Sequence, residues 1–156
     1  MNVPPKRPAA ASGGSRPAFI FDIDGTIIDS MPFHGRSWQV FLERRGVAYD
    51  GEGFLRRTAG RTGTEIMREL FGPMSDEAAW SLVHEKEDAY RELFRPAFRE
   101  IAGFRDFARQ ARAEGVRIAC ATAGDAKNIA FALEGLGMGG EFDGANTAVL
   151  MEVSDR

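Results

Sequence analysis

The stretch AFIFDIDGTIIDS, residues 18–30, decides the fold. Its first part, AFIFDI, is short, mostly apolar and rich in aromatic and β-branched residues, and Gly25 follows it. Such a run is typical of a buried parallel strand that ends in a turn. The sequence therefore predicts a strand over residues 18–23, with polar residues where that strand ends.

Two acidic residues, Asp22 and Asp24, stand at the predicted carboxyl end of this strand. Residues two apart in a strand point to the same side, so their carboxylates converge where open α/β sheets bind ligands. Carboxylates this close disfavour each other's ionisation unless a cation lies between them. The pair could bind Mg²⁺, or one Asp could attack a phosphoryl group while the other transfers the proton, and these two uses are compatible. The alternatives are solvated acids or an EF-hand loop, and the latter lacks its Glu at residues 30–33.

The chain beyond this strand shows alternating helical and strand patterns. Helices are predicted at residues 31–45, 64–71, 75–93, 104–114 and 125–136, and further strands at 116–121 and 147–153. Ser75 is placed to cap the long helix that follows it. This order of elements indicates an α/β fold with a helical module inserted after the first strand.

A second polar site is predicted at Thr122, where the strand over residues 116–121 ends and Ala123-Gly124 lead into a helix. A hydroxyl group with free backbone N–H groups at a helix N-terminus forms an anion site. Thr in this place also caps helices for purely structural reasons. The interpretation as a phosphate site therefore depends on the acidic pair of the first strand.

Several segments together resemble the haloacid dehalogenase (HAD) superfamily. FDIDGTIIDS resembles its first motif, and ATAG, residues 121–124, resembles its second. DSMPFHGRSWQVFLERRGV and AGRTGTEIM resemble the helical cap of the β-phosphoglucomutase and phosphosugar phosphatase branch. The resemblance covers residues 18–144 and implies a Rossmann-like core with a parallel sheet plus an inserted α-helical cap. Residues 1–17, rich in Pro, Gly and Ser and without apolar periodicity, predict a disordered leader. We expect the core at residues 18–29 and 100–156 and the helical cap at 30–99.

The resemblance also implies a role for each residue of the predicted site. Asp22 would be the nucleophile and a metal ligand. Asp24 would be the general acid/base, and its backbone carbonyl would also contact the Mg²⁺ ion. Thr122 would bind the phosphate, with Ala123 and Gly25 beside it.

Residues of the cap would contact the substrate and select it. The resemblance places His34 where the mutases carry a histidine that assists proton transfer, while an exposed helix histidine is the alternative. Gly60 and Arg61 fall in the loop that reads substrate. The mutases carry a basic residue three positions after this glycine, where Gly63 stands here, and this departure favours a phosphatase. Arg57 and Arg61 could supply the positive charge instead, although arginines on a cap surface are usually solvated.

Two further motifs of the superfamily are not recognisable: a Lys that offsets the site's negative charge and an acidic pair that completes the Mg²⁺ site. Lys127 is a candidate for the former, although its position at a helix start favours an exposed side chain. Arg156 is the other basic candidate, and Glu152 and Asp155 are the only late acids. We therefore interpret the chain as truncated at its C-terminus. The strand over residues 18–23 would then form an exposed edge, which a homodimer would shield.

Composition excludes several other classes. The 156 residues carry a net charge of −3, which gives no reason to expect nucleic acid or an anionic membrane as partner. Cys120 is the only cysteine, so neither an internal disulfide nor a cysteine-based zinc site can form. No apolar run approaches the roughly 20 residues of a membrane span, and the first residues lack a signal peptide's apolar stretch. We expect a cytoplasmic protein.

The sequence thus predicts a Mg²⁺-dependent phosphatase that acts on a small phosphorylated metabolite, a sugar phosphate, through an aspartyl-phosphate. Phosphotransfer of the β-phosphoglucomutase type is the first alternative. The second is a truncated, catalytically incompetent relative that acts as a binder or is a non-functional fragment.

Overall fold

The computed structural model describes residues 17–140, 142 and 144–146. The predicted leader lies outside these residues except for Pro17, whose carbonyl accepts a hydrogen bond from Arg117 N at 2.9 Å. The strand predicted at residues 147–153 also lies outside them. Among the described residues, no helix is long and apolar enough to cross a membrane.

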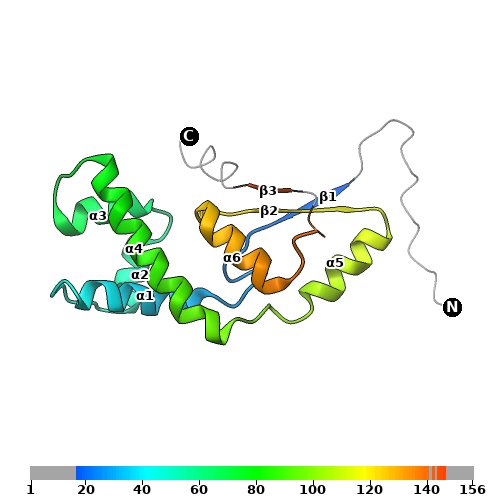
Figure 1. Ribbon diagram of the computed structural model, residues 1–156, viewed down its shortest axis with the longest axis horizontal. Coiled ribbons are helices and arrows are strands. Elements are labelled where there is room, and N and C mark those ends of the chain that lie inside the picture. Colours follow the sequence, from blue (N-terminus) through cyan, green and yellow to red (C-terminus); the bar gives the residue numbers. More distant parts are fainter. Residues whose placement is uncertain (1–16, 141, 143, 147–156) are drawn as a thin grey trace.

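A parallel sheet carries the site. Its strands are β1 (Ala18–Phe21), β2 (Arg117–Ala121) and β3 (Gly144–Asn146), in the order β1-β2-β3. Helices α5 (Phe104–Ala113) and α6 (Ala126–Leu136) cover one face of this sheet (Figure 1). The fold is therefore the predicted α/β class, with the ends of β1 and β2 side by side.

The remaining helices form the cap, which lies beyond the carboxyl ends of the strands (Figure 1). Its elements are α1 (Met31–Glu43), α2 (Glu52–Thr58), α3 (Gly63–Phe71), α4 (Asp76–Phe94) and the 3₁₀ turn η1 (Arg95–Ala97). Ser75 caps α4 as predicted, because its hydroxyl accepts a hydrogen bond from Ala78 N. Helix α2 was not predicted, since it is short and contains a glycine that weakens the helical signal.

Two apolar clusters divide the interior. The cap has its own cluster, which includes Trp38, Phe41 and Val83. The other cluster lies beneath the sheet and contains Tyr90 and Phe94 from the last turns of α4. Helix α4 thus belongs to both clusters, and for this reason the division at residues 30 and 99 stays a prediction.

Strand β1 is parallel to β2 as predicted. The burial suggested by its apolar run is wrong, and the exposed edge that was also predicted for this strand is confirmed. It lies at the edge of the sheet, where Phe19 is 45% exposed and Ile20 is 65% exposed. An edge strand presents unpaired backbone groups to solvent, so burial requires a further strand. The homodimer that would shield this edge stays a prediction.

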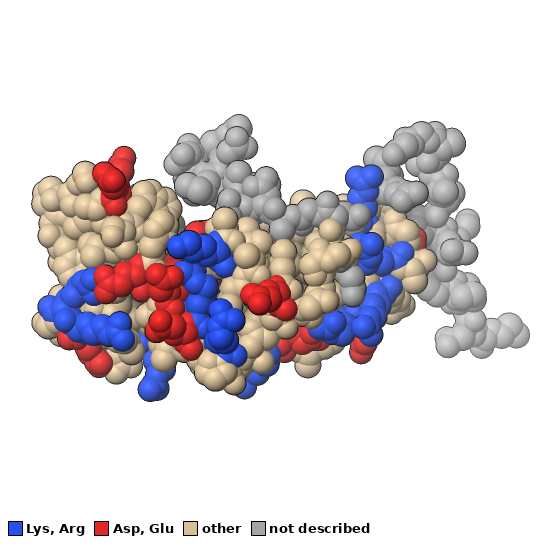
Figure 2. Space-filling model, viewed as in Figure 1, with Lys and Arg blue, Asp and Glu red and all other residues tan. Residues whose placement is uncertain are grey.

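Basic and acidic side chains lie next to one another over the cap (Figure 2). Several of them form ion pairs, such as Arg57 with Asp50 and Arg45 with Glu85. Exposed pairs of this kind contribute little to stability, typically below about 1 kcal/mol. They do, however, neutralise charge that the cap would otherwise present.

Candidate active site

Asp22 follows β1 directly, and its side chain is exposed. Its Oδ1 accepts a hydrogen bond from Ile23 N at 2.8 Å. Burial and the negative charge of Asp24 raise the pKa of Asp22, although hydrogen bonds from Ile23 and Thr122 partly oppose this. The carboxylate is thus accessible to a ligand. The two hydrogen bonds do not fully offset the effects of burial and of the Asp24 charge on its ionised form.

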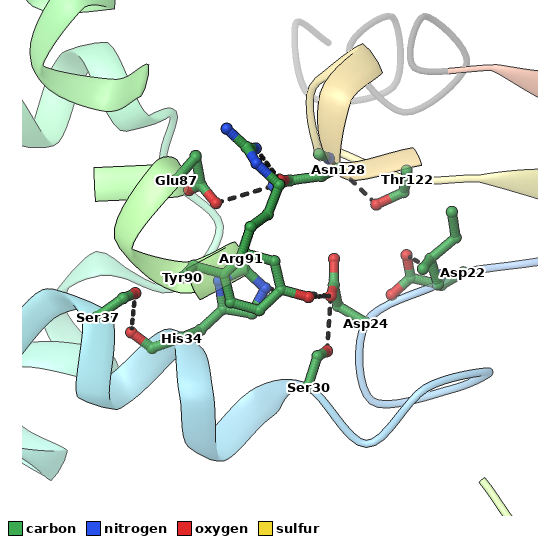
Figure 3. Close-up of polar contacts among 12 residues, drawn as sticks. Asp22, Asp24, Ser30, His34, Ser37, Glu87, Tyr90, Arg91, Thr122 and Asn128 are labelled. Atoms are coloured by element: carbon green, nitrogen blue, oxygen red, sulfur yellow. Dashed lines mark hydrogen bonds and ion pairs between the residues drawn. The ribbon is translucent and has the colours of Figure 1, made fainter. Parts of the chain in front are cut away.

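Asp24 is held in a different environment. Its Oδ1 accepts hydrogen bonds from Ser30 Oγ at 2.6 Å and from Tyr90 OH at 3.3 Å, and it lies 3.1 Å from His34 Nε2 (Figure 3). Burial alone would raise the pKa of Asp24, but the hydrogen bonds from His34, Ser30 and Tyr90 outweigh it and lower the pKa. The donors converge on Oδ1, which leaves Oδ2 to carry a proton. The pKa of Asp22 is thus raised and that of Asp24 is lowered, and the donors to Oδ1 hold the Asp24 carboxylate in one orientation.

His34 is fixed by contacts on both ring nitrogens. Its Nδ1 lies 3.1 Å from Lys86 Nζ, and its ring stacks on Tyr90 with 3.9 Å between the ring centroids. A lysine ammonium group only donates, so Nδ1 accepts and Nε2 carries the proton that is donated to Asp24. The alternative of an exposed helix histidine is wrong, because the side chain is 18% exposed and contacts Asp24.

Lys86 is a buried cation, 3% exposed, at the centre of the cap side of the site. Glu87 accepts a hydrogen bond from its Nζ at 2.8 Å. Burial alone would raise the pKa of Glu87, but the charge of Lys86 and the hydrogen bonds from Lys86 and Asn128 outweigh it and lower this pKa. Lys86 therefore links a buried carboxylate to the histidine that contacts Asp24.

The loop after β2 forms the opposite side of the site. Thr122 is buried, and its Oγ1 accepts a hydrogen bond from Gly124 N at 3.1 Å. The same hydroxyl lies within hydrogen-bonding reach of Asp22, whose pKa it lowers. Asp125 caps α6 by accepting a hydrogen bond from Asn128 N at 2.8 Å. The structure thus brings Asp22, Asp24 and Thr122 together (Figure 3).

Other predicted residues have different surroundings. Gly25 has a φ of 71°, and its N–H donates to Ile28 O at 2.9 Å, so it forms the turn after β1. Ala123 is exposed beside Thr122. Lys127 is exposed on α6. The phosphate contacts predicted for Gly25 and Ala123 stay predictions, as does charge compensation by Lys127.

The arginines predicted to read substrate are paired with acids of the cap. Arg61 forms an ion pair with Glu69, and Arg57 donates to Asp50 Oδ2 at 2.7 Å. Gly60 lies beside Arg61 in the loop between α2 and α3, with a φ of 75°. The structure does not join these residues to the acidic pair through any contact among the residues that it describes, so their substrate contacts stay predictions.

Sequence reasoning missed Ser30, Lys86 and Tyr90. Lys86 and Tyr90 share one face of α4 with buried apolar residues, in the series Ala79, Val83, Lys86, Tyr90 and Phe94. A lysine within such a stripe is a signal, because buried lysines are rare unless they are paired. Ser30 precedes α1 as an N-cap would, yet its hydroxyl makes no cap hydrogen bond and donates to Asp24 instead.

The acidic pair fits a divalent metal ion in part. The pKa of Asp22 is raised by burial and by the like charge of Asp24, and a cation bound there would relieve both effects. Oxygen ligands of this type suit Mg²⁺. Within the described residues, no group of three or more His, Cys, Asp or Glu side chains could hold a metal. The predicted late acids, Glu152 and Asp155, and the basic candidate Arg156 lie outside those residues.

The close approach of Val83 explains why a glycine, and not a basic residue, stands at position 63. A Cβ atom on Gly63 would lie 2.9 Å from Val83 Cγ2, and Val83 is buried between α3 and α4. We expect Gly63→Ala to destabilise the protein by about 1–3 kcal/mol, the usual cost of overpacking. Thermal unfolding followed by circular dichroism measures this. Gly139→Ala is the matched control, because nothing lies within 4 Å of its Cβ position; an equal change in both variants would contradict the explanation.

The parallel sheet, the acidic pair after β1 and the helical cap define an α/β protein with an inserted cap, and the family match agrees with this class. The model of the haloacid dehalogenase-like hydrolases matches residues 17–154, so this chain belongs to that family. The recognition made from the sequence is thereby confirmed.

Individual relatives agree with this placement. Fructose-1-phosphate phosphatase YqaB of Escherichia coli (strain K12) is 30% identical over 74 residues, which are 47% of this chain and 39% of that protein. The crystal structure of a HAD hydrolase of family IA, variant 3, from Entamoeba histolytica HM-1:IMSS has a TM-score of 0.75 and 24% identity. That of β-phosphoglucomutase from Clostridium difficile has a TM-score of 0.71 and 23% identity.

The two structures match 85% and 86% of this chain, and each match covers 62% of the other chain. At these identities they show the fold alone. This chain thus spans about three fifths of the solved relatives and two fifths of the curated one.

Proposed function

We propose that this protein is a Mg²⁺-dependent phosphatase that hydrolyses a small phosphorylated metabolite, a sugar phosphate, through an aspartyl-phosphate on Asp22. The observation that carries the proposal is the contrast within the acidic pair. Asp22 is exposed and only partly compensated, whereas Asp24 is fixed through Oδ1 by Ser30, His34 and Tyr90. One carboxylate is free to attack, and the other is held in one orientation to transfer a proton.

The residues of the chain would act in sequence. Asp22 attacks the phosphorus atom, and Asp24 donates a proton from Oδ2 to the leaving oxygen. Asp24 then takes a proton from the water that cleaves the aspartyl-phosphate. Thr122 and the backbone of its loop hold the phosphoryl oxygens, and the cap helices limit the access of bulk water. Bound at the Asp22 carboxylate and the Asp24 carbonyl, Mg²⁺ would offset the negative charge of the phosphoryl group.

The acceptor of the phosphoryl group separates the two enzymatic candidates. A phosphatase transfers it to water, and a mutase transfers it to a sugar hydroxyl. The close approach of Gly63 to Val83 leaves no room for the basic residue that the mutases carry there. This supports water as the acceptor. The named activity of the Escherichia coli relative, a sugar-phosphate phosphatase, supports the same choice.

Metal removal tests the proposal. The chain is incubated with a panel of sugar phosphates that includes fructose 1-phosphate, and inorganic phosphate and isomerised sugar phosphate are both measured. We expect phosphate release with Mg²⁺, its loss with excess EDTA and its recovery when Mg²⁺ is restored, since the acidic pair provides oxygen ligands for this ion. Isomerised product would indicate a mutase. Absence of both products would favour the binding or non-functional relative.

A further inference from the structure

A group of polar side chains connects the cap to the helix that follows the phosphate loop. Asn128 on α6 is 7% exposed, and both ends of its amide are used. Its Oδ1 accepts a hydrogen bond from Arg91, and its Nδ2 donates to Glu87 Oε2 at 2.8 Å (Figure 3). Glu87 and Arg91 lie four positions apart on α4, so they project from the same face. The positive charge of Arg91 and the negative charge of Glu87, both on α4, therefore fix the orientation of the Asn128 amide on α6.

Further contacts hold this arrangement in place. Arg91, also buried, forms an ion pair with Asp88 on its own helix and lies 3.7 Å from Asp125 Oδ1 at the start of α6. The second oxygen of Asp125, Oδ2, is buried and has no hydrogen-bond partner. An attraction to Arg91 compensates this buried carboxylate in part. Buried polar groups are costly when their partners move away, so these contacts favour one relative position of the two helices.

We propose that Glu87, Arg91 and Asn128 form a clasp that holds α4 of the cap in register with the Thr122 loop, and that Asn128 is a positioning residue for phosphoryl transfer. The second part of this proposal rests on the proposed function.

The geometry explains why the register matters. Helix α4 carries Lys86 and Tyr90, which contact His34 and Asp24. Helix α6 continues from the Thr122 loop, and the hydrogen bond from Asn128 N to Asp125 ties its first turn to that loop. A displacement of α4 along α6 would therefore move the proton donors of Asp24 relative to the phosphate-binding hydroxyl. Small displacements of this kind reduce rates substantially.

A distance measurement tests the clasp without any need for activity. Glu77 on α4 and Ala130 on α6 are both exposed, and each is replaced by Cys and spin-labelled. The buried Cys120 is replaced by Ala in every sample. We expect a narrow distance distribution that broadens or shifts in Asn128→Ala and changes less in Arg91→Lys, which keeps the charge near Asp125. Lys127→Ala, an exposed neighbour on the same helix, should leave the distribution unchanged. An unchanged distribution in Asn128→Ala would overturn the clasp.

Turnover tests the positioning role. With the sugar phosphate panel, we expect Asn128→Ala to lower kcat by about tenfold, which corresponds to the loss of one charged hydrogen bond. Its KM should change little, and its melting temperature should fall because Glu87 and Arg91 lose a buried partner. Both variants are assayed well below their melting temperatures, where Arg91→Lys should keep more of the kcat than Asn128→Ala. An unchanged kcat with a broadened distribution would overturn the positioning role. If the unmodified chain releases no phosphate, the proposed function and the positioning role fall together, and the distances alone decide the clasp.

Discussion

Asp22→Asn should lower Mg²⁺-dependent phosphate release by at least about 10³-fold, as expected for the loss of a nucleophile. The amide has nearly the same shape but cannot attack phosphorus, and it removes the negative charge that the proposed Mg²⁺ site would use. Release of inorganic phosphate from the best sugar phosphate of the panel measures the effect. Release by the variant equal to that of the unmodified chain would rule out Asp22 as nucleophile.

The same substitution should not destabilise the metal-free protein. Burial and the charge of Asp24 raise the pKa of Asp22 in the folded state. The stability that comes from this shift is present below the unfolded pKa and is lost as pH rises through the folded value. At neutral pH the ionised carboxylate therefore opposes folding, and a neutral amide removes that effect. We expect an unchanged or higher melting temperature at pH 7.

Asp29→Asn is the matched control for Asp22→Asn. Asp29 lies on the same connection after β1, and it pairs with Arg99 at the surface. We expect phosphate release close to that of the unmodified chain and only a small change in stability, because partly exposed ion pairs contribute little. A loss of activity in this control comparable to that of Asp22→Asn would indicate a general disturbance of the loop.

Lys86→Met should destabilise the protein by about 3 kcal/mol, or roughly 10 °C in melting temperature. The methionine fills a similar volume, but Glu87 loses its buried cation and His34 Nδ1 loses its donor. Removal of one partner from a buried ion pair leaves an uncompensated charge, which costs more than the pair contributed. Denaturant unfolding measures the change. We also expect reduced turnover, since the histidine that contacts Asp24 would no longer be fixed.

A double substitution distinguishes the unpaired charge from lost packing. Lys86→Met combined with Glu87→Gln removes both charges and should recover much of the lost stability. Lys127→Met changes a lysine that is exposed on α6 and should have almost no effect on stability. No recovery in the double variant would show that packing, rather than charge, makes Lys86 important.

The local patterns predicted most elements within a few residues. Apolar periodicity located α1 and α4, and the Ser75 cap fixed where α4 begins, because these signals lie within one or two helical turns. The connection at residues 52–58 was not recognised as helix α2. For β1, the apolar run AFIF by itself predicted burial, whereas the unrecognised motifs predicted an exposed edge, and the edge is what the structure shows. Burial depends on which strands lie beside a strand, and a short apolar run is compatible with either position.

In the candidate site, too, some features are local in the sequence and others depend on the tertiary structure. The chain order Asp22-Ile-Asp24 and the strand-loop-helix around Thr122 are local features, and the sequence was sufficient to identify them. The residues that set the state of Asp24 come from the cap, and Lys86 and Tyr90 stand more than sixty positions along the chain from Asp22. Only the packing of α4 against α1 brings Lys86 within 3.1 Å of His34.

The sequence by itself thus determined the class of the protein: an acidic pair at the end of a β-strand, a second motif after the next strand, and a helical insertion between them. The tertiary structure alone decided that Asp24 Oδ1 receives its donors from Ser30, from α1 and from α4, and that a buried lysine fixes His34. It also decided that Arg57 and Arg61 are paired with acids of the cap. Backbone periodicity and turn chemistry act between neighbours in the chain, whereas hydrogen bonds and buried charges depend on distances that only the folded chain sets.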